Sequence, residues 1–197
     1  MELIDMIAQG IGIFAMVFNI FSYQQKNQKT VILFQLFGGM LFGIHYWMLG
    51  ATVGALMNVI AVIRAIVFIF KEKLHADHIA WTVGFITVFL VSYVLTFTVF
   101  GKEPTPLNFV FEFLPVIGMT ALTIGFRCRD AKAIRQFGLI SSPSWLIYNI
   151  VNFSIGAICC EVISLISILI GMMRLDSKKA QKKHCVTQNT EGNGEQL

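Results

Sequence analysis

The chain has 197 residues, of which 56% are hydrophobic and 13% are charged, and its formal net charge is +4. With a mean hydropathy of +0.72, it carries too little polar side-chain surface to cover a soluble domain of this length. The basic residues are spread over short polar stretches and a tail. This distribution indicates membrane topology and lipid contact, and it argues against nucleic-acid binding.

Seven apolar segments predict how the chain is organised. A helix that crosses the hydrocarbon core of a bilayer needs ~20 mostly apolar residues. In chain order, the segments that meet this requirement are residues 4–24, 31–49, 52–71, 79–100, 107–126, 134–152 and 155–174. Glu2 and Asp5 stand at the start of the first segment instead of a basic stretch, so we expect a span and not a cleaved signal peptide. The sequence predicts an all-α polytopic membrane protein with seven transmembrane helices.

Most basic residues lie in the connections on one side of the predicted membrane spans. The connections after the first, third and fifth segments, together with the tail, contain Lys26, Lys29, Lys71, Lys73, Arg127, Arg129, Lys132, Arg135, Lys178, Lys179, Lys182 and Lys183. The connections on the other side contain Lys102, next to Glu103. The positive-inside rule therefore predicts an N-terminus outside the cell and a cytoplasmic C-terminus. The polar stretch 176–197 is expected to be a disordered cytoplasmic tail.

Small residues recur on one face of the third and seventh segments. They are Gly50, Gly54, Asn58, Ala61 and Ala65 in the third, and Gly156, Cys160, Ser164, Ser167 and Gly171 in the seventh. Spacings of three and four residues return to the same face of a helix, and small side chains let neighbouring helices approach closely in hydrocarbon. Both faces are therefore predicted to be packing surfaces.

The two small-residue faces also suggest an internal repeat. A constant shift along the chain lays Tyr46 on Tyr148 and Asn58 on Cys160, whereas the fourth segment has no counterpart. We predict two parallel three-helix bundles, residues 1–74 and 102–175, joined by a linker helix within 75–101. Parallel repeats of this kind are a known plan for transporters.

Short motifs carry a family resemblance. They are MIAQGIGIFA near the start, FEFLPVIG at 111–118, FRC at 126–128, and SIG at 154–156 followed by E-x-x-S at 161–164. In these motifs the chain is similar to the YgjV family of bacterial inner membrane proteins, and its 3-1-3 order resembles the SWEET and PQ-loop superfamily. The resemblance covers roughly residues 5–175. It implies a SWEET-like seven-helix fold and a bacterial inner membrane location, and it does not name a substrate.

The chain departs from the superfamily pattern at two places. Tyr23-Gln24-Gln25 stands where PQ-loop proteins have proline–glutamine at the end of the first helix. The prolines that SWEET-like proteins use as hinges in both units occur here only in the second, as Pro115 and Pro143. Each removes a helical hydrogen bond, so each is a candidate hinge or a static kink.

Three charged residues lie inside predicted spans and away from their ends: Arg64, Glu112 and Glu161. Each would cost ~2.5–3.5 kcal/mol near the centre of a membrane helix. Their estimated depths allow an ion pair between Arg64 and a glutamate across the two units. Such a pair could serve packing alone, or one carboxylate could bind a polar substrate or couple transport to protons. In a third alternative, Arg64 and Glu112 extend to opposite membrane surfaces and have no role.

Uncharged polar residues widen the candidate site. The candidate amides within the spans are Asn19, Gln35, Asn58, Asn149 and Asn152. For a single buried amide, a hydrogen bond between helices is the commoner use, and we favour it for Asn19 and Gln35. For Asn58 a substrate-binding role is equally favoured, because the resemblance implies an asparagine at this place in the third helix. Trp145 and Tyr148, near Asn149, could form a stacking wall.

The sequence favours a transporter or facilitator for a small polar solute, working by alternating access between the two units. The predicted binding residues are Asn58, Arg64, Glu112, Asn149, Cys160 and Glu161, with Pro115 and Pro143 as hinges. The alternative is a non-transporting receptor or scaffold with the same fold. No nucleophile–base–acid set is evident, so we predict no enzyme, no cofactor and no metal site. The expected partners are the lipid bilayer, a small solute and a second copy of the chain in a homo-oligomer.

Overall fold

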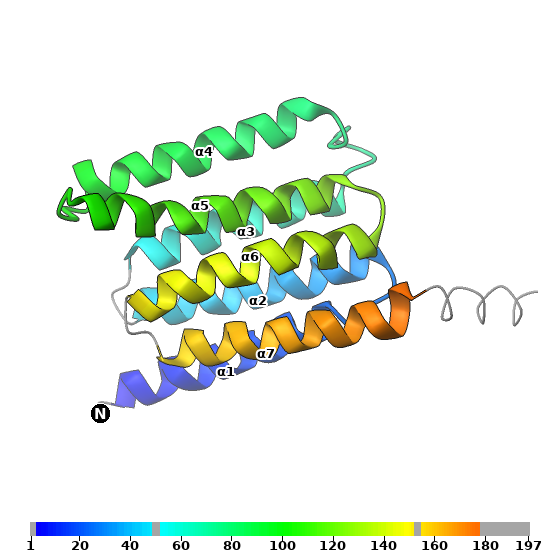
Figure 1. Cartoon of the computed structure of the whole chain (residues 1–197), viewed down its shortest axis with the longest axis horizontal. Coiled ribbons are helices and arrows are strands. Elements are labelled where there is room, and N and C mark those ends of the chain that lie inside the picture. The colour runs from blue at the N-terminus through cyan, green and yellow to red at the C-terminus, as the bar shows by residue number, and fades with distance from the viewer. Residues whose placement is uncertain (1–2, 49–51, 152–154, 178–197) are drawn as a thin grey trace, which may run out of the picture.

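The computed structural model describes residues 3–48, 52–151 and 155–177, and this part of the chain is helical without strands (Figure 1). The α-helices are α1 (Leu3–Ser22), α2 (Gln28–Met48), α3 (Thr52–Ile69), α4 (Ile79–Thr98), α5 (Pro106–Arg127), α6 (Ala131–Val151) and α7 (Ile155–Gly171). α7 continues into a short π-helical turn, η1 (Met172–Asp176). Each predicted segment corresponds to one α-helix, with boundaries that differ by about three residues at most. The prediction of an all-α chain is confirmed for the described residues.

The helices differ in how strongly their composition favours a membrane span. Four described stretches are long and apolar enough to cross a bilayer: Gln28–Met48, Ile79–Thr98, Pro106–Arg127 and Ala157–Asp176. The apolar runs in α1 and α3 are shorter. α6 is the most polar, because it buries three serines and Asn149 among its apolar residues. Large apolar side chains such as Phe14, Trp47 and Leu107 are exposed on the outside of the bundle, as expected for a surface in contact with lipid.

The helices form two facing layers with one helix at the edge (Figure 1). α1, α2 and α3 pack side by side in chain order, and α5, α6 and α7 do the same. Across the layers, α3 contacts α5, α2 contacts α6, and α1 contacts α7. α4 packs mainly on α5 and touches α3. An aromatic cluster fixes this edge: the Phe68 ring of α3 lies 5.9 Å from Phe126 of α5 and 6.2 Å from Phe85 of α4, centroid to centroid.

One end of the bundle, here called the basic end, carries η1 and the connections after α1, α3 and α5 (Figure 1). The basic residues in and next to these connections are Lys26, Lys29, Lys71, Lys73, Arg127, Arg129, Lys132, Arg135 and Arg174. At the opposite end, the connection between α4 and α5 carries Lys102. Among the described residues, the fold therefore gathers at one end the basic side chains that the sequence assigned to one side of the membrane. Assignment of that end to the cytoplasm rests on the positive-inside rule.

A buried arginine joins three segments at the basic end. Arg135 of α6 is 2% exposed and forms a bidentate ion pair with Asp176 of η1, in which Nε donates to Oδ2 at 2.8 Å and Nη2 donates to Oδ1. Its Nη1 also donates to the carbonyl oxygen of Gln25, in the turn after α1, at 2.8 Å. Arg135 therefore links both layers, although the sequence pattern identified it only as a topology residue.

Further hydrogen bonds between the layers lie at the same end. Gln24 Nε2 donates to the carbonyl oxygen of Ser167 at 2.6 Å and to its Oγ at 2.9 Å, and Ser167 Oγ donates to the Ile20 carbonyl oxygen at 2.7 Å. Lys71 Nζ donates to the two carbonyl oxygens at the end of α5, at 2.6 and 2.9 Å. The basic end is thus held closed by polar contacts between the layers.

The predicted small-residue faces allow close helix contact. A Cβ added to Gly171 would lie 2.5 Å from the carbonyl oxygen of Tyr23, so only glycine lets η1 and α7 approach the turn after α1 this closely. A Cβ on Gly54 would lie 2.9 Å from the Tyr46 ring. Both faces therefore pack as expected at these positions, while Gly50 lies outside the described residues.

Candidate functional site: a polar cavity between the layers

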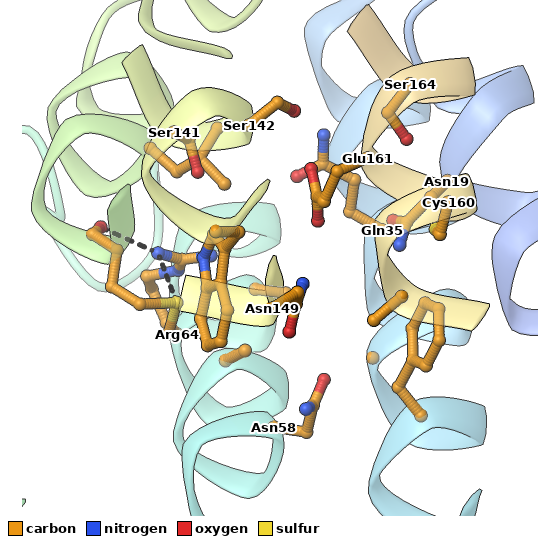
Figure 2. A pocket seen from close by; sticks show the side chains of 18 of the residues that line it. Asn19, Gln35, Asn58, Arg64, Ser141, Ser142, Asn149, Cys160, Glu161 and Ser164 are labelled. Carbon is orange, nitrogen blue, oxygen red and sulfur yellow. Dashed lines mark hydrogen bonds between the residues drawn. The ribbon is translucent and has the colours of Figure 1, made fainter. Parts of the chain in front are cut away.

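A cavity of about 120 Å³ lies between the two layers of helices (Figure 2). Its described lining comes from α1, α2 and α3 on one side and from α5, α6 and α7 on the other, without a contribution from α4. The polar lining residues are Asn19, Tyr23, Gln35, Tyr46, Asn58, Arg64, Ser141, Ser142, Trp145, Asn149, Cys160, Glu161 and Ser164. The cavity is therefore a concentration of polar groups within an otherwise apolar bundle.

Arg64 occupies one side of the cavity and is 3% exposed. Its Nη1 donates to the Met119 carbonyl oxygen at 2.9 Å and to Thr123 Oγ1 at 3.2 Å, both on α5. The guanidinium also lies over the Phe126 ring, 4.7 Å from the centroid, in cation–π geometry. Its Nε is buried and has no hydrogen-bond partner among the described residues. Arg64 is thus held against α5 with one donor unsatisfied.

Glu161 of α7 lines the same cavity, and Figure 2 shows its carboxylate directed into it, across from Arg64. Ser142 of α6 lines the cavity near it (Figure 2). The next residue toward the N-terminus, Cys160, is 4% exposed and also lines the cavity, whereas Cys159 is exposed. Adjacent helical positions point ~100° apart, so the two cysteines face different surroundings.

The ion pair between Arg64 and a glutamate that the estimated depths allowed is not formed: within the described chain, no ion pair includes Arg64 or Glu161. Glu112 lies outside the cavity lining. It is 7% exposed and pairs with Lys102, whose Nζ lies 2.8 Å from Oε1. The expectation failed because Lys102 reaches back from the connection before α5 to Glu112, while α5 offers Arg64 a carbonyl oxygen and a hydroxyl instead.

The amides converge on the cavity as a group. Asn19, Gln35, Asn58 and Asn149 all line it, and Asn149 is buried. Asn58 Nδ2 donates to the carbonyl oxygen one turn earlier in α3 at 2.9 Å, which leaves its amide oxygen as an acceptor. Gln35 Nε2 is 3.3 Å from Ser22 Oγ, so it also contributes to packing, as the sequence favoured. Asn152 lies outside the described residues.

Both candidate hinge prolines lie inside continuous helices. Pro115 is buried in α5, and Pro143 is half-buried in α6. Pro143 immediately follows Ser141 and Ser142, which line the cavity, and Ser144 Oγ donates to the Ile140 carbonyl oxygen at 2.8 Å. Proline removes a helical hydrogen bond at each position, so a bend there would move the cavity wall. Their role as hinges stays a prediction.

Sequence reasoning missed three serines of the site. Ser141 and Ser142 of α6 line the cavity, and Ser164 of α7, predicted only as a packing residue, does as well. A signal for the first two was present, because Ser141, Ser142, Trp145 and Asn149 follow the three- and four-residue spacing of one helix face. A polar stripe of this kind in a membrane helix indicates a surface turned away from lipid.

The arrangement is suited to binding a small polar molecule. Opposite charges, several amides and hydroxyls, and the aromatic rings of Tyr46 and Trp145 face a small internal space. Small-molecule sites combine apolar walls with a few placed polar groups in this way. The fold and site define the class as a multi-helix membrane protein built around a buried polar cavity.

The comparison with protein families gives a more specific assignment. The chain belongs to the Imp-YgjV family, described as bacterial inner membrane protein, whose model matches residues 6–179. The family predicted from the short motifs is therefore confirmed, together with a location in the bacterial inner membrane. Neither the search of curated proteins nor the search of solved structures gave a match.

Proposed function

We propose that this protein is a transporter or facilitator for small polar solutes that works by alternating access between two three-helix units, residues 1–74 and 102–175. The observation that carries the proposal is the polar cavity between the layers, lined by both units and not by α4 in the described chain. A linker helix at the edge is what a SWEET-like 3-1-3 order requires, and Asn58 and Cys160, paired by the internal shift, both face the cavity.

The contacts between the layers suggest which state of the transport cycle this structure represents. The bonds made by Arg135, Gln24 and Lys71 gather at the basic end, which the positive-inside rule assigns to the cytoplasm. The N-terminus then lies outside. Closure at the basic end supports a state in which solute reaches the cavity from outside, and alternating access requires these contacts to break during the cycle.

The first experiment compares the small-molecule content of cells that lack or overproduce the protein, and then measures uptake of the changed solutes into proteoliposomes. Asn58→Ala should reduce uptake because it removes an amide from the cavity. Gln136→Ala is the matched control, since Gln136 is an exposed amide on α6. If no solute changes in cells and none enters proteoliposomes, the transport proposal fails.

The two adjacent cysteines provide a second, substrate-independent test. In a variant that retains a single cysteine, a small water-soluble thiol reagent should modify Cys160 if the cavity is hydrated. Cys159 is the control, because its exposed side chain faces the outside of the bundle and not the cavity. Equal protection of both positions from the reagent would indicate a dry interior, which contradicts the transport proposal.

A second candidate function is a receptor or scaffold that presents the loops of the basic end to a partner. The observation in its favour is a concave surface of about 720 Å³ at this end, lined by residues from all three connections. Its charges are mixed, and ion pairs link Lys29 with Glu72 and Arg129 with Asp77. This candidate predicts that substitutions in the cavity leave the function intact, whereas loop substitutions remove it.

A further inference from the structure

The cavity contains two ionisable side chains of opposite type that are not paired with each other. Arg64 and Glu161 both line it, yet no nitrogen–oxygen pair between them lies within 4.0 Å, the limit for an ion pair. A buried charge without a partner is strongly unfavourable, and opposite charges in one low-dielectric space attract each other. The helices nevertheless hold them apart, with Arg64 bound to α5 and Glu161 beside Ser142 (Figure 2).

The Arg64 side chain has donor capacity left for a ligand. Nη1 is used on Met119 and Thr123, whereas Nε is buried and lacks a partner among the described residues. A guanidinium presents its N–H groups in a planar fork that matches a carboxylate. A carboxylate in the cavity beside the guanidinium would neutralise its buried positive charge.

The Glu161 side of the cavity has the complementary chemistry. A carboxylate accepts hydrogen bonds from an ammonium group, and the surrounding amides and hydroxyls supply further acceptors, including those of Asn149 and Ser164 (Figure 2). A ligand that places an ammonium group here and a carboxylate at Arg64 would neutralise both buried charges at once.

The charges and the size of the cavity select against other solutes. A simple anion would meet Glu161, a simple cation would meet Arg64, and a neutral polyol would leave both charges without a counterion. The volume of about 120 Å³ is small beside the ~300–1,000 Å³ that is typical of ligand pockets. The ligand is therefore small, with its two charged groups only a few bonds apart.

We propose that the cavity binds a small zwitterion of the amino-acid class, with its carboxylate on Arg64 and its ammonium group near Glu161. This inference rests on the proposed transport function for its physiological meaning, but binding can be measured separately. Asn58 and Asn149 then bind the remaining polar edges of the ligand, and the walls formed by Tyr46 and Trp145 limit the size of its side chain.

The test uses the full chain, purified and reconstituted in proteoliposomes, with chemically matched probes. The probes are glycine and alanine as zwitterions, N-acetylglycine as the carboxylate alone, glycine methyl ester as the ammonium alone, and glycerol as the neutral solute. We expect uptake of at least one zwitterion at about tenfold the rate of the other three probes. Stabilisation of the detergent-solubilised protein against heat by the same probes reports binding without transport.

Glu161→Gln is the decisive variant. It should reduce zwitterion uptake and zwitterion-dependent stabilisation about tenfold, and raise the relative preference for N-acetylglycine, because the repelling carboxylate is gone. Glu112→Gln is the matched control, since Glu112 is also buried but pairs with Lys102 outside the cavity lining, and it should leave the preference unchanged. Arg64→Lys keeps the charge without the Nε donor and should weaken zwitterion binding.

The outcomes separate this inference from the proposed function. Uptake confined to glycerol or to the singly charged probes overturns the zwitterion assignment and leaves transport standing. Stabilisation by alanine, lost in Glu161→Gln, with no uptake of any probe supports the binding site and contradicts transport. Neither uptake nor stabilisation by glycine or alanine overturns the zwitterion assignment, while the metabolite comparison decides transport independently. An equal loss in Glu161→Gln and Glu112→Gln also overturns it, because the effect would not depend on the cavity.

Discussion

Substituting Arg135 by methionine should destabilise the protein more than any other single change at the basic end. The side chain is 2% exposed, and the Asp176 side chain with which it pairs is 8% exposed. Methionine fills most of the volume of the arginine stem but cannot donate hydrogen bonds. It would leave a buried carboxylate without a counterion and remove a donor from the Gln25 carbonyl oxygen.

The size of the effect follows from these lost contacts. Removing one partner of a buried ion pair typically costs about 3–5 kcal/mol, because the other charge stays buried. In a chain of this length each kcal/mol corresponds to roughly 2–4 °C in Tm, so we expect a decrease of roughly 10 °C. The double substitution Arg135→Met with Asp176→Leu removes the orphaned charge. It should recover part of the loss, leaving about 1–3 kcal/mol for the unsatisfied carbonyl group.

The assay is thermal unfolding of the detergent-solubilised protein, followed by tryptophan fluorescence and by loss of the monodisperse peak in size-exclusion chromatography. Arg129→Met is the matched control, since Arg129 lies at the same end but its ion pair with Asp77 is exposed, with 82% and 47% of the side chains accessible. Exposed pairs contribute little. Equal Tm values for the two variants, or a double variant less stable than Arg135→Met, would refute the reasoning.

Two further predictions concern close packing and pH. Gly171→Ala should lower Tm because its Cβ would lie 2.5 Å from the Tyr23 carbonyl oxygen. Gly84→Ala, with open space around the added Cβ, should raise stability by up to ~1 kcal/mol. Thermal unfolding of both variants checks that the two changes in Tm have opposite signs. The pKa of Asp77 is lowered by hydrogen bonds from its own backbone N–H and from Arg129. Its carboxylate therefore stabilises the fold at pH values above its usual pKa of 3.8. This contribution is lost as the pH falls through the lower pKa of the folded state. The Tm difference between wild type and Asp77→Asn should therefore be present at neutral pH and vanish in acid, and a difference that grows in acid would contradict the assignment.

Much of the fold could be predicted because a bilayer imposes simple requirements. Backbone groups in hydrocarbon must be paired within a helix, so runs of ~20 apolar residues identify helices directly. This explains why the predicted segments and the observed helices agree closely, even for the more polar α6. The small residues of α7 also identified a packing face, because Gly171 and Ser167 allow contact with the turn after α1.

The partners of the buried charges could not be predicted from spacing. Helical periodicity gives the depth and face of a residue, but a long side chain has several possible partners within its reach. Arg64 donates to a carbonyl oxygen and a hydroxyl on α5 instead of pairing with a glutamate. Glu112 pairs with Lys102, which lies in the connection between α4 and α5. The positions of the asparagines could be predicted without knowing their hydrogen-bond partners. Residues on the inner faces of packed helices converge on a shared cavity whichever partner each one has.

Glu112 pairs with Lys102 and does not line the cavity, and this affects which parts of the molecule move together in the proposed mechanism. Lys102 and Glu112 both belong to the end of the bundle opposite the basic end, and Tyr148 of α6 interacts electrostatically with Glu112. These groups hold the outer parts of α5 and α6 together as one body. Pro115 and Pro143 lie between this body and the contacts at the basic end, where loss of a helical hydrogen bond lowers the resistance to bending. Under alternating access, the outer halves of α5 and α6 would then move together against the first layer, and the cavity between them would close without breaking the ion pair of Glu112.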